Sequence, residues 1–379
     1  MHGVKRLFAW MIPRFDPDRF EVSLVSLRRR DLSEETLDAL GIDITYLERS
    51  RFDPMTLPAL LRVVDRKQID LLHLHGYGAT TFGRLVAAMR GLPVVLHEHA
   101  NLTKTPWFQK IADRLLERYT DVAIAVSEST AEFVRDARLI RPEHVRVVYL
   151  GAPLDEFSEP RPAEEMAATR HEFGVQPGET LVGTITRLHE SKGNEYLVEA
   201  ARRVLDARPA TRFVLLGEGP LRPALDAQAA ALGLGDRFVF GGFVKDVARA
   251  LWAFDIAAFP SLWEGTPLTV FETMAAGRPI VATDADGLMD VLTAGRDAVI
   301  VPRRNAAALA DAMVSLIDDP AARARLGAAA RETARQYDIG AFVRKMEQLY
   351  EVLHRESRAR NRRVADELDL SFLTRKAGA

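Results

Sequence analysis

Short apolar runs rich in β-branched residues alternate with amphipathic stretches along most of the chain. The apolar runs predict strands, and the stretches between them, such as LPALLRVVDRK and WFQKIADRLLERY, have helical spacing. Strands separated by helices of this length indicate βαβ units and a parallel sheet. The predicted strands are residues 21–27, 42–47, 69–75, 93–99, 121–127 and 145–151 in the first half, and 180–188, 211–217, 237–243, 255–261, 279–284 and 297–302 in the second.

The alternation breaks over residues 152–180, where APLDEFSEPRPAEE is rich in proline and acid and is typical of a linker. We therefore expect an α/β fold with two tandem Rossmann-like, doubly wound parallel-sheet domains, residues 1–160 and 161–340. Residues 341–379 should form a helix that crosses back to the first domain, followed by a basic tail. Doubly wound sheets bind ligands beyond the carboxyl ends of their strands, and two such domains can face those ends toward a central cleft.

Composition narrows the class of protein without defining it. A chain of 379 residues is long for one core, and its net charge of -2 gives no reason to expect nucleic acid as a partner. The chain has no cysteine, which excludes disulfides and thiolate metal sites and fits a reducing compartment. No apolar run is long enough to span a bilayer. We therefore expect a cytoplasmic protein.

The segment PSLWEGTPLTVFETMAAGRPIVAT, residues 260–283, combines a helix start with two carboxylates. Thr266 followed by Pro267 predicts an N-cap and a first helical residue, and Gly277 predicts the end of the helix. Glu264 then precedes the helix, and Glu272 lies about five residues inside it, roughly 7–8 Å along the axis. Free amides at the helix start and the helix dipole favour phosphate oxygens, and a carboxylate at that distance can accept both hydroxyls of a ribose. Either glutamate taken alone would be typical of an ordinary solvated residue.

Two cations follow the first strand of the second domain, in GTITRLHESKGNEYLVEA. Arg187 lies at the end of the predicted strand, and Lys192 precedes Gly193, which opens the next helix. Fixed cations stabilise the negative charge that develops on a departing nucleoside diphosphate, and the planar guanidinium can hold two oxygens at once. In isolation, LHESKG would be typical of a polar surface loop, but its place after a strand favours phosphate binding.

The two glutamates separated by seven residues (here Glu264 and Glu272), within S-x-x-E-G-x-P-x-x-x-x-E-x-M-A-x-G-x-P-I-V-A-T, resemble the signature of glycosyltransferase family 4. GTITRLHESKG, LLGEGPLRPAL, FGGFVKDVARALWAFDIAAFPS and VPRRNAAALADAMVSLIDDP match the same family in order and spacing, so the resemblance covers nearly the whole chain. It implies a retaining enzyme of the GT-B fold that transfers a sugar from a nucleotide donor to a hydroxyl acceptor. The implied donor-binding residues are Gly3, Arg187, Lys192, Glu264, Gly265, Thr266, Pro267, Leu268, Thr269 and Glu272.

Histidines gather at two strand ends of the first domain, in LLHLHGYG and PVVLHEHAN. The resemblance implies that His99 lies beside the reacting sugar, that it is catalytic together with Glu264, Arg187 and Lys192, and that His75 and His99 are on the acceptor side. His73 is more typical of a structural residue. His97, Glu98 and His99 could also form a metal cluster, but alternate residues of a strand point to opposite faces, and no local spacing supplies a fourth ligand. We therefore expect no metal.

The helix that contains Trp107, Phe108, Ile111 and Leu115 has an apolar stripe. This stripe predicts a face turned toward the core. Lys104, Lys110 and Arg114 leave open an alternative, peripheral contact with an acidic membrane at the inner membrane face.

The chain departs from the family pattern at two places. Asp286 stands where the family commonly has a glycine, and Asp290 stands where it has a glutamate, so an acid near the diphosphate would repel it unless the side chain turns away. At the N-terminus, HGVKRLFAW matches the family's glycine-rich turn and first helix from Gly3 onward, but the strand that should precede them is missing. We therefore expect that Met1 is internal, that the natural protein starts roughly 10–20 residues earlier with a strand of typical length, and that the chain as given is poorly stable and weakly active.

The expected function is retaining transfer of a sugar from a UDP- or GDP-linked donor to a glycan, a lipid-linked acceptor or a small-molecule hydroxyl, in surface polysaccharide or glycolipid synthesis. No metal or other cofactor is expected, because the cations and helix amides supply the positive field. Two alternatives remain: a nucleotide-sugar epimerase or hydrolase of the same fold, and a non-catalytic nucleotide-sugar-binding subunit.

Overall fold

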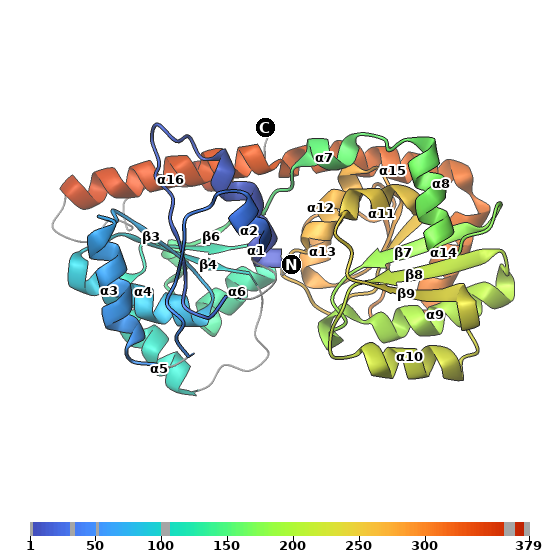
Figure 1. Cartoon of the computed structure of the whole chain (residues 1–379), viewed down its shortest axis with the longest axis horizontal. Coiled ribbons are helices and arrows are strands. Elements are labelled where there is room, and N and C mark those ends of the chain that lie inside the picture. The colour runs from blue at the N-terminus through green and yellow to red at the C-terminus, as the bar shows by residue number, and fades with distance from the viewer. Residues whose placement is uncertain (1–2, 31–34, 51–52, 100–106, 360–367, 375–379) are drawn as a thin grey trace. The chain divides into compact units, whose positions relative to one another are not determined.

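The computed structural model describes residues 3–30, 35–50, 53–99, 107–359 and 368–374, which form two compact units (Figure 1). The first unit comprises the chain up to Gly151 together with the chain from Ile339 onward. The second unit is Ala152–Asp338. All twelve predicted strands are confirmed, each of them shorter than predicted.

A single six-stranded parallel sheet forms the centre of the second unit. Three of its four central strands are buried along their whole length, as is typical of a parallel sheet covered on both faces. The core on one face is closed by α9 (Asn194–Ala207), α10 (Arg222–Ala231) and α14 (Ala306–Asp318). The strands, in the order β12-β11-β10-β7-β8-β9, are β7 (Thr180–Ile185), β8 (Thr211–Leu216), β9 (Phe238–Gly242), β10 (Ile256–Phe259), β11 (Ile280–Thr283) and β12 (Ala298–Val301).

The strand order of this sheet reverses between β7 and β10. From β7 the chain proceeds outward through β8 to β9, then returns to β10 and proceeds outward in the other direction. The loops that follow β7 and β10 therefore diverge, and in a doubly wound sheet this topological switch point is where ligands bind. Residues 186–193 and 260–267 form these two loops.

The opposite face of this sheet carries α11 (Val247–Ala253), α12 (Leu268–Ala275) and α15 (Pro320–Ala334). The segment predicted as a linker also lies on this unit, and that prediction was wrong: it contains α7 (Leu154–Ser158) and α8 (Ala163–Glu172). Helix α8 follows Pro162 and has two glutamates in its first turn, which suit a helix N-terminus. Arg170 ties it to the sheet through hydrogen bonds to Asp255 (2.8 Å) and the Glu179 carbonyl (2.7 Å).

The strands of the first unit form two separate parallel sheets. One sheet pairs β1 (Leu24–Ser26) with β2 (Ile44–Tyr46). The other has the order β3-β4-β5-β6, with β4 and β5 wholly buried. Among the described residues, no strand hydrogen-bonds to both β1 and β3. The second sheet consists of β3 (Leu72–His75), β4 (Val94–Glu98), β5 (Val122–Ala125) and β6 (Val145–Val147).

Helices cover both faces of the four-stranded sheet (Figure 1). The predicted N-terminal helix is confirmed as α1, and Pro13 lies in the 3₁₀ turn that ends it. Leu7 and Met11 of α1 are buried, as is Phe15 just after it. The helices of this unit are α1 (Gly3–Met11), α2 (Glu35–Ala39), α3 (Thr56–Arg66), α4 (Tyr77–Arg90), α5 (Trp107–Leu116), α6 (Glu128–Asp136) and α16 (Ile339–Ala359).

Helix α5 packs in the opposite sense to the one predicted. Trp107, Phe108, Ile111 and Leu115 are exposed, so the prediction that their stripe faces the core was wrong. The buried side of α5 is instead polar, because Asp113 enters an ionic network with Arg84 and Arg138 beneath the helix.

Candidate active site

The loop after β7 packs against the turn after β8. Gly217 has a φ of +136°, and a Cβ on it would lie 1.8 Å from the Thr186 carbonyl oxygen, so no other residue fits there. The Leu188 amide donates to the Glu218 carbonyl oxygen (2.9 Å). Together these contacts hold residues 186–188, and with them Arg187, at the switch point of the sheet. The Arg187 side chain is exposed.

The two switch-point loops touch one another directly. Gly193 has a φ of +57°, and a Cβ on it would lie 2.1 Å from the Pro260 carbonyl oxygen. The Leu262 amide donates to the Ser191 carbonyl oxygen (2.8 Å). Gly193 therefore permits an approach between the loops that any side chain would prevent.

Lys192 and Glu264 connect these loops by an ion pair. The Lys192 ammonium donates to both oxygens of the Glu264 carboxylate, with Nζ 2.6 Å from Oε2. The Ser261 hydroxyl donates to Oε1 of the same carboxylate (2.8 Å). Only 12% of the Lys192 side chain and 8% of the Glu264 side chain are exposed, so the pair is largely removed from water. A positively charged group and a carboxylate are thus fixed side by side where the fold class binds ligands.

Helix α12 begins one residue later than the sequence predicted. Pro267 has an extended ψ of 126° and occupies the N-cap position with no side-chain capping bond, so Thr266 is not the N-cap and Leu268 is the first helical residue. The predicted end is confirmed, since Gly277 follows the helix with a φ of +64°. Glu272 is the fifth helical residue, as predicted, and its side chain is completely buried.

Asp286 lies close to this loop, and its charge is compensated by a residue that the sequence analysis missed. A Cβ on its neighbour Gly287 would lie 1.4 Å from the Gly265 carbonyl oxygen, so α13 (Asp286–Met289) packs directly against the Glu264–Gly265 segment. Arg303, just after β12, donates to the Asp286 carboxylate (2.9 Å) and to the Leu262 carbonyl oxygen (2.9 Å). The repulsion expected from Asp286 is therefore offset by Arg303. The basic pair after a predicted strand in VPRRNAA was the signal that could have identified it.

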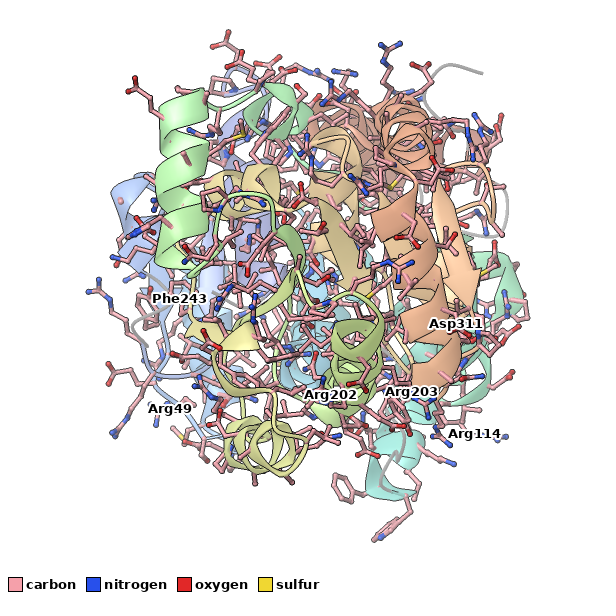
Figure 2. The ribbon with its side chains drawn as sticks, turned by 90° about the vertical axis from the view of Figure 1, so that its right-hand side faces the viewer. Arg49, Arg114, Arg202, Arg203, Phe243 and Asp311 are labelled. Carbon is pink, nitrogen blue, oxygen red and sulfur yellow. The ribbon has the colours of Figure 1, made fainter. Side chains whose placement is uncertain are left out.

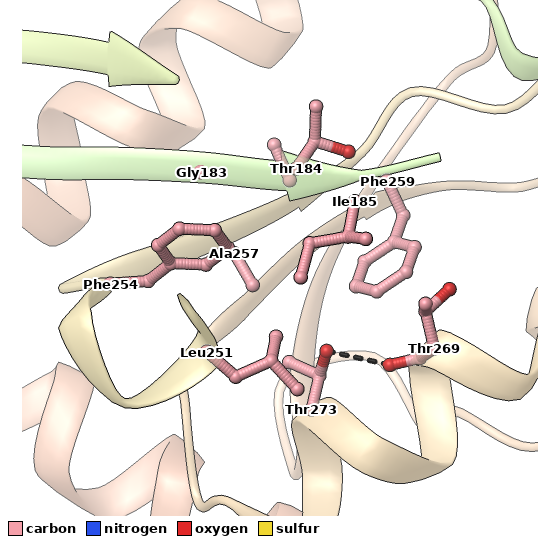
Figure 3. Close-up of a pocket in the computed structure, with 10 residues that line it drawn as sticks. Gly183, Thr184, Ile185, Leu251, Phe254, Ala257, Phe259, Thr269 and Thr273 are labelled. Atoms are coloured by element: carbon pink, nitrogen blue, oxygen red, sulfur yellow. Dashed lines mark hydrogen bonds between the residues drawn. The ribbon is translucent and has the colours of Figure 1, made fainter. Parts of the chain in front are cut away.

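A small apolar gap lies beside the switch point, between β7 and β10 and helices α11 and α12 (Figure 3). Leu251, Phe254, Phe259, Thr269 and Thr273 are among the residues that line it. The Thr273 hydroxyl donates to the Thr269 carbonyl oxygen (2.6 Å) within α12. No charged side chain lines this gap, so it does not supply the groups that a diphosphate needs.

In the first unit, four histidines form one cluster at the carboxyl ends of β3 and β4. The parallel pairing sets His75 opposite His97 and brings His73 and His99 to the same face. His73 Nε2 lies 3.1 Å from His97 Nδ1, and His75 Nδ1 lies 2.8 Å from His99 Nε2. Glu98 points to the other face, as predicted, where it pairs with Arg138. The cluster thus joins the acceptor-side candidates His75 and His99 to His73 and to His97, which is fully buried.

Burial keeps these imidazoles neutral. Desolvation lowers the pKa of His73 to about 3 and that of His99 to about 4, and it holds the pKa values of His75 and His97 well below the usual range. The Tyr350 hydroxyl lies 2.5 Å from His73 Nδ1 and joins the cluster to α16. A neutral imidazole both donates and accepts a hydrogen bond, as a residue that orients sugar hydroxyls must.

One nitrogen from each of His73, His75 and His97 lies within 4.8 Å of the others, which is the kind of grouping that can bind a metal. The sequence of β4 alone could not show this grouping, because His73 and His75 come from the neighbouring strand β3. Within this group only the rings of His73 and His97 are stacked, 6° from parallel, and the His75 ring is tilted by 32° from His73 and by 37° from His97. Imidazole lone pairs lie in the ring plane, and His73 Nε2 and His97 Nδ1 face one another at 3.1 Å, so these two nitrogens are already paired with each other.

The structure therefore groups the predicted site residues in two places. Arg187, Lys192, Glu264, Glu272 and the start of α12 belong to the second unit, around its switch point. Gly3, His75 and His99 belong to the first unit, where Gly3 begins α1.

Comparison with known proteins defines the class to which this fold and site belong. Residues 2–156 match the family profile described as Glycosyltransferase Family 4, and residues 179–319 match that described as Glycosyl transferases group 1. The chain is a glycosyltransferase of the GT-B fold. It belongs to glycosyltransferase family 4.

Two curated relatives and one solved structure illustrate the likeness. The putative glycosyltransferase EpsD of Bacillus subtilis (strain 168) is 26% identical over 318 residues, covering 80% of this chain and 83% of that protein. The alpha-D-kanosaminyltransferase of Streptomyces kanamyceticus is 27% identical over 294 residues, covering 73% and 75%. Anabaena HepE in complex with UDP-glucose has the same fold, with a TM-score of 0.82 at 21% identity over 93% of this chain and 96% of that one. None of the helices in the described part of the chain is long and apolar enough to cross a membrane.

Proposed function

We propose that the chain transfers a hexosyl group from a nucleoside-diphosphate sugar, UDP-linked or GDP-linked, to a hydroxyl acceptor with retention of configuration. The observation that carries the proposal is the Lys192–Glu264 pair, which sits where the two switch-point loops meet and is largely shielded from water. Anabaena HepE, a protein of the same fold, binds UDP-glucose, which supports UDP as the first donor to test.

The second unit would hold the donor. Arg187 and Lys192 would bind the diphosphate, and the free amides of Gly265, Leu268 and Thr269 at the start of α12 would add hydrogen bonds to its oxygens. Pro267 has no N–H and would contribute only the turn. Glu272, inside the helix, would accept the ribose hydroxyls, and Glu264 would hold hydroxyls of the transferred sugar while it keeps Lys192 oriented.

The transfer step would proceed on one face of the sugar. The acceptor oxygen forms a bond to the anomeric carbon as the bond from that carbon to the diphosphate oxygen breaks. The departing diphosphate takes the proton of the acceptor hydroxyl, so the new bond has the configuration of the old one. Arg187 and Lys192 would stabilise the negative charge that develops on the diphosphate. Because this charge is larger in the transition state than in the bound donor, the two cations would lower the barrier to transfer.

The first unit would supply the acceptor side. His99 would hydrogen-bond hydroxyls at the reacting centre, and its partner His75 would fix its orientation through the 2.8 Å contact. The lowered pKa of His99, about 4, keeps the ring neutral at the pH of a cell, so that it adds no positive charge beside the sugar. We also propose a cytoplasmic location, which the complete lack of cysteine supports, and an acceptor in surface polysaccharide or glycolipid synthesis. The relatives include a 2-deoxystreptamine glucosyltransferase, so a small-molecule acceptor is tested alongside glycans and lipid-linked sugars.

The experiment is a ligand screen followed by product analysis. UDP- and GDP-hexoses are first ranked by thermal shift, where a ligand at a hundred times its dissociation constant stabilises by about 2.7 kcal/mol. The best donor is then incubated with the acceptor panel, and the product is analysed by mass spectrometry and by proton NMR of the anomeric signal. A glycoside with the donor's anomeric configuration supports the proposal. Isomerised or free sugar from every acceptor mixture would indicate an epimerase or hydrolase, and donor binding without any turnover would indicate a non-catalytic subunit.

Metal independence is tested in the same assay. The reaction is expected to proceed at an unchanged rate after dialysis against EDTA. Loss of activity that returns with added divalent ions would show that the cations of the chain do not suffice, and the histidine cluster would then be the first site to examine.

A further inference from the structure

Helix α5 has its polar side buried and its apolar side exposed. Gln109, Asp113 and Leu116 face inward, and the Asp113 carboxylate accepts hydrogen bonds from Arg138 Nε (2.7 Å) and from Arg84. Both arginines are almost completely buried. The helix is thus anchored to its unit by buried charges, and its amphipathicity is reversed relative to that of an ordinary surface helix.

The outward side of α5 carries large apolar side chains. Trp107 is 74% exposed, Ile111 52% and Leu115 65%, and they form a row because each is four residues from the next. Phe108, also exposed, meets the edge of the Trp107 ring with centroids 6.0 Å apart. Exposure of this size at adjacent positions marks an interaction surface and not scattered surface residues.

A row of cations runs beside the apolar row. Lys110 and Arg114 are each one residue before a member of that row, and Arg118 follows in the next turn; all three are exposed. Figure 2 shows Arg114 on the outer side of its helix. In the described part of the chain, neither Lys110 nor Arg114 forms an ion pair, and the nearby Glu117 carboxylate is held by Arg141 Nε (2.9 Å).

We propose that this surface of α5, defined by Trp107, Lys110, Ile111, Arg114 and Leu115, binds the surface of an anionic lipid bilayer. Tryptophan prefers the boundary between headgroups and acyl chains, and an amphipathic helix lies in that plane with its apolar row inserted. The cations beside the apolar row can pair electrostatically with the phosphates of acidic lipids. A protein partner of the same surface would have to bury at least two cations with matching acids, whereas a bilayer lets them stay at the hydrated headgroups.

This proposal is independent of the proposed chemistry, because the surface contains none of the donor or acceptor residues. Membrane binding without turnover would contradict the proposed chemistry alone. Turnover without membrane binding would contradict the membrane proposal alone. A bilayer-bound enzyme would find a lipid-linked acceptor by diffusion in two dimensions.

The test is flotation of the full chain with large vesicles, made of phosphatidylcholine alone or with about 30% phosphatidylglycerol. We expect binding to the anionic vesicles that weakens with salt, and little binding to the neutral ones. The triple variant Trp107→Ser, Ile111→Ser, Leu115→Ser should lower the partition constant on anionic vesicles by about tenfold or more, because three large side chains no longer insert.

A matched control removes three other exposed apolar side chains from the same unit, in the variant Leu40→Ser, Met55→Ser, Met89→Ser. It should bind vesicles as the wild type does. A second measurement does not depend on a triple variant: brominated lipids should quench tryptophan fluorescence in the wild type and much less in Trp107→Phe, which still binds.

Three results would overturn the proposal. The first is no flotation of the wild type with anionic vesicles, and the second is an equal loss in the α5 variant and the matched control. The third is a dimer of the wild type by light scattering that the α5 variant converts to a monomer without any change in flotation, because a second copy of the chain would then be what covers this surface.

Discussion

Substitution of Lys192 by methionine tests the central ion pair through protein stability. The change keeps the length of the side chain but leaves the Glu264 carboxylate, only 8% exposed, without its counter-charge. Breaking a fully buried pair on one side costs about 3–5 kcal/mol. Here Ser261 still donates to the carboxylate and some water reaches it, so we expect a loss of about 2 kcal/mol. For a unit of this size the melting temperature should fall by roughly 4–8 °C.

The double variant Lys192→Met, Glu264→Gln separates this effect from simple loss of packing. With both charges gone, the buried carboxylate no longer lacks a partner, and the double variant should be more stable than Lys192→Met alone. Thermal and denaturant unfolding of the four proteins forms a double-mutant cycle, from which we expect a coupling energy of about 1.5–2 kcal/mol. The exposed pair Arg202–Asp206, with Nη2 2.7 Å from Oδ1, is the matched control and should give less than about 0.5 kcal/mol. Additive effects at Lys192 and Glu264 would contradict the assignment of a shielded pair.

Two further predictions concern the histidine cluster. His99→Ala should reduce transfer by orders of magnitude with little change in melting temperature, because the ring is only half-buried. His97→Ala should mainly lower the melting temperature, because that ring is fully buried. The reverse pattern in paired activity and melting assays would refute the assignment. The lowered histidine pKa values also predict acid sensitivity. Below about pH 6.5 the unfolded chain takes up protons that the folded cluster does not, so each such histidine should lower the free energy of unfolding by about 1.4 kcal/mol per pH unit, until the folded pKa is reached. Denaturant unfolding between pH 7 and pH 5 measures this slope, and it should be shallower in His97→Asn.

The sequence predicted most of what the backbone does locally. Every strand was marked by its apolar run, and Gly193 and Gly277 marked positions where the chain needs a positive φ. The spacing of Glu272 within its helix was also correct. These features depend on neighbouring residues, so a one-dimensional pattern contains them.

The errors arose where a contact joins distant parts of the chain. The apolar stripe of α5 showed that the helix is amphipathic but not which side faces inward. That is decided by Arg84 and Arg138, the buried partners of Asp113. The histidine cluster depends on the pairing of β3 with β4, and the compensation of Asp286 depends on Arg303 from another strand. The proline-rich segment before β7 was interpreted as a linker because its helices are short and their stabilising contacts lie elsewhere in the unit.

The most direct test of the donor site is calorimetric titration with UDP and with uridine. Arg187→Gln should weaken UDP binding by about tenfold or more while leaving uridine binding unchanged, because the guanidinium acts on the diphosphate alone. Glu272→Gln should weaken both ligands by a similar factor, because the ribose is common to both. Arg202→Gln removes the same charge from a partly exposed position on α9 (Figure 2) and should change neither. Unchanged UDP binding in Arg187→Gln, or equal losses of UDP and uridine in that variant, would contradict the account.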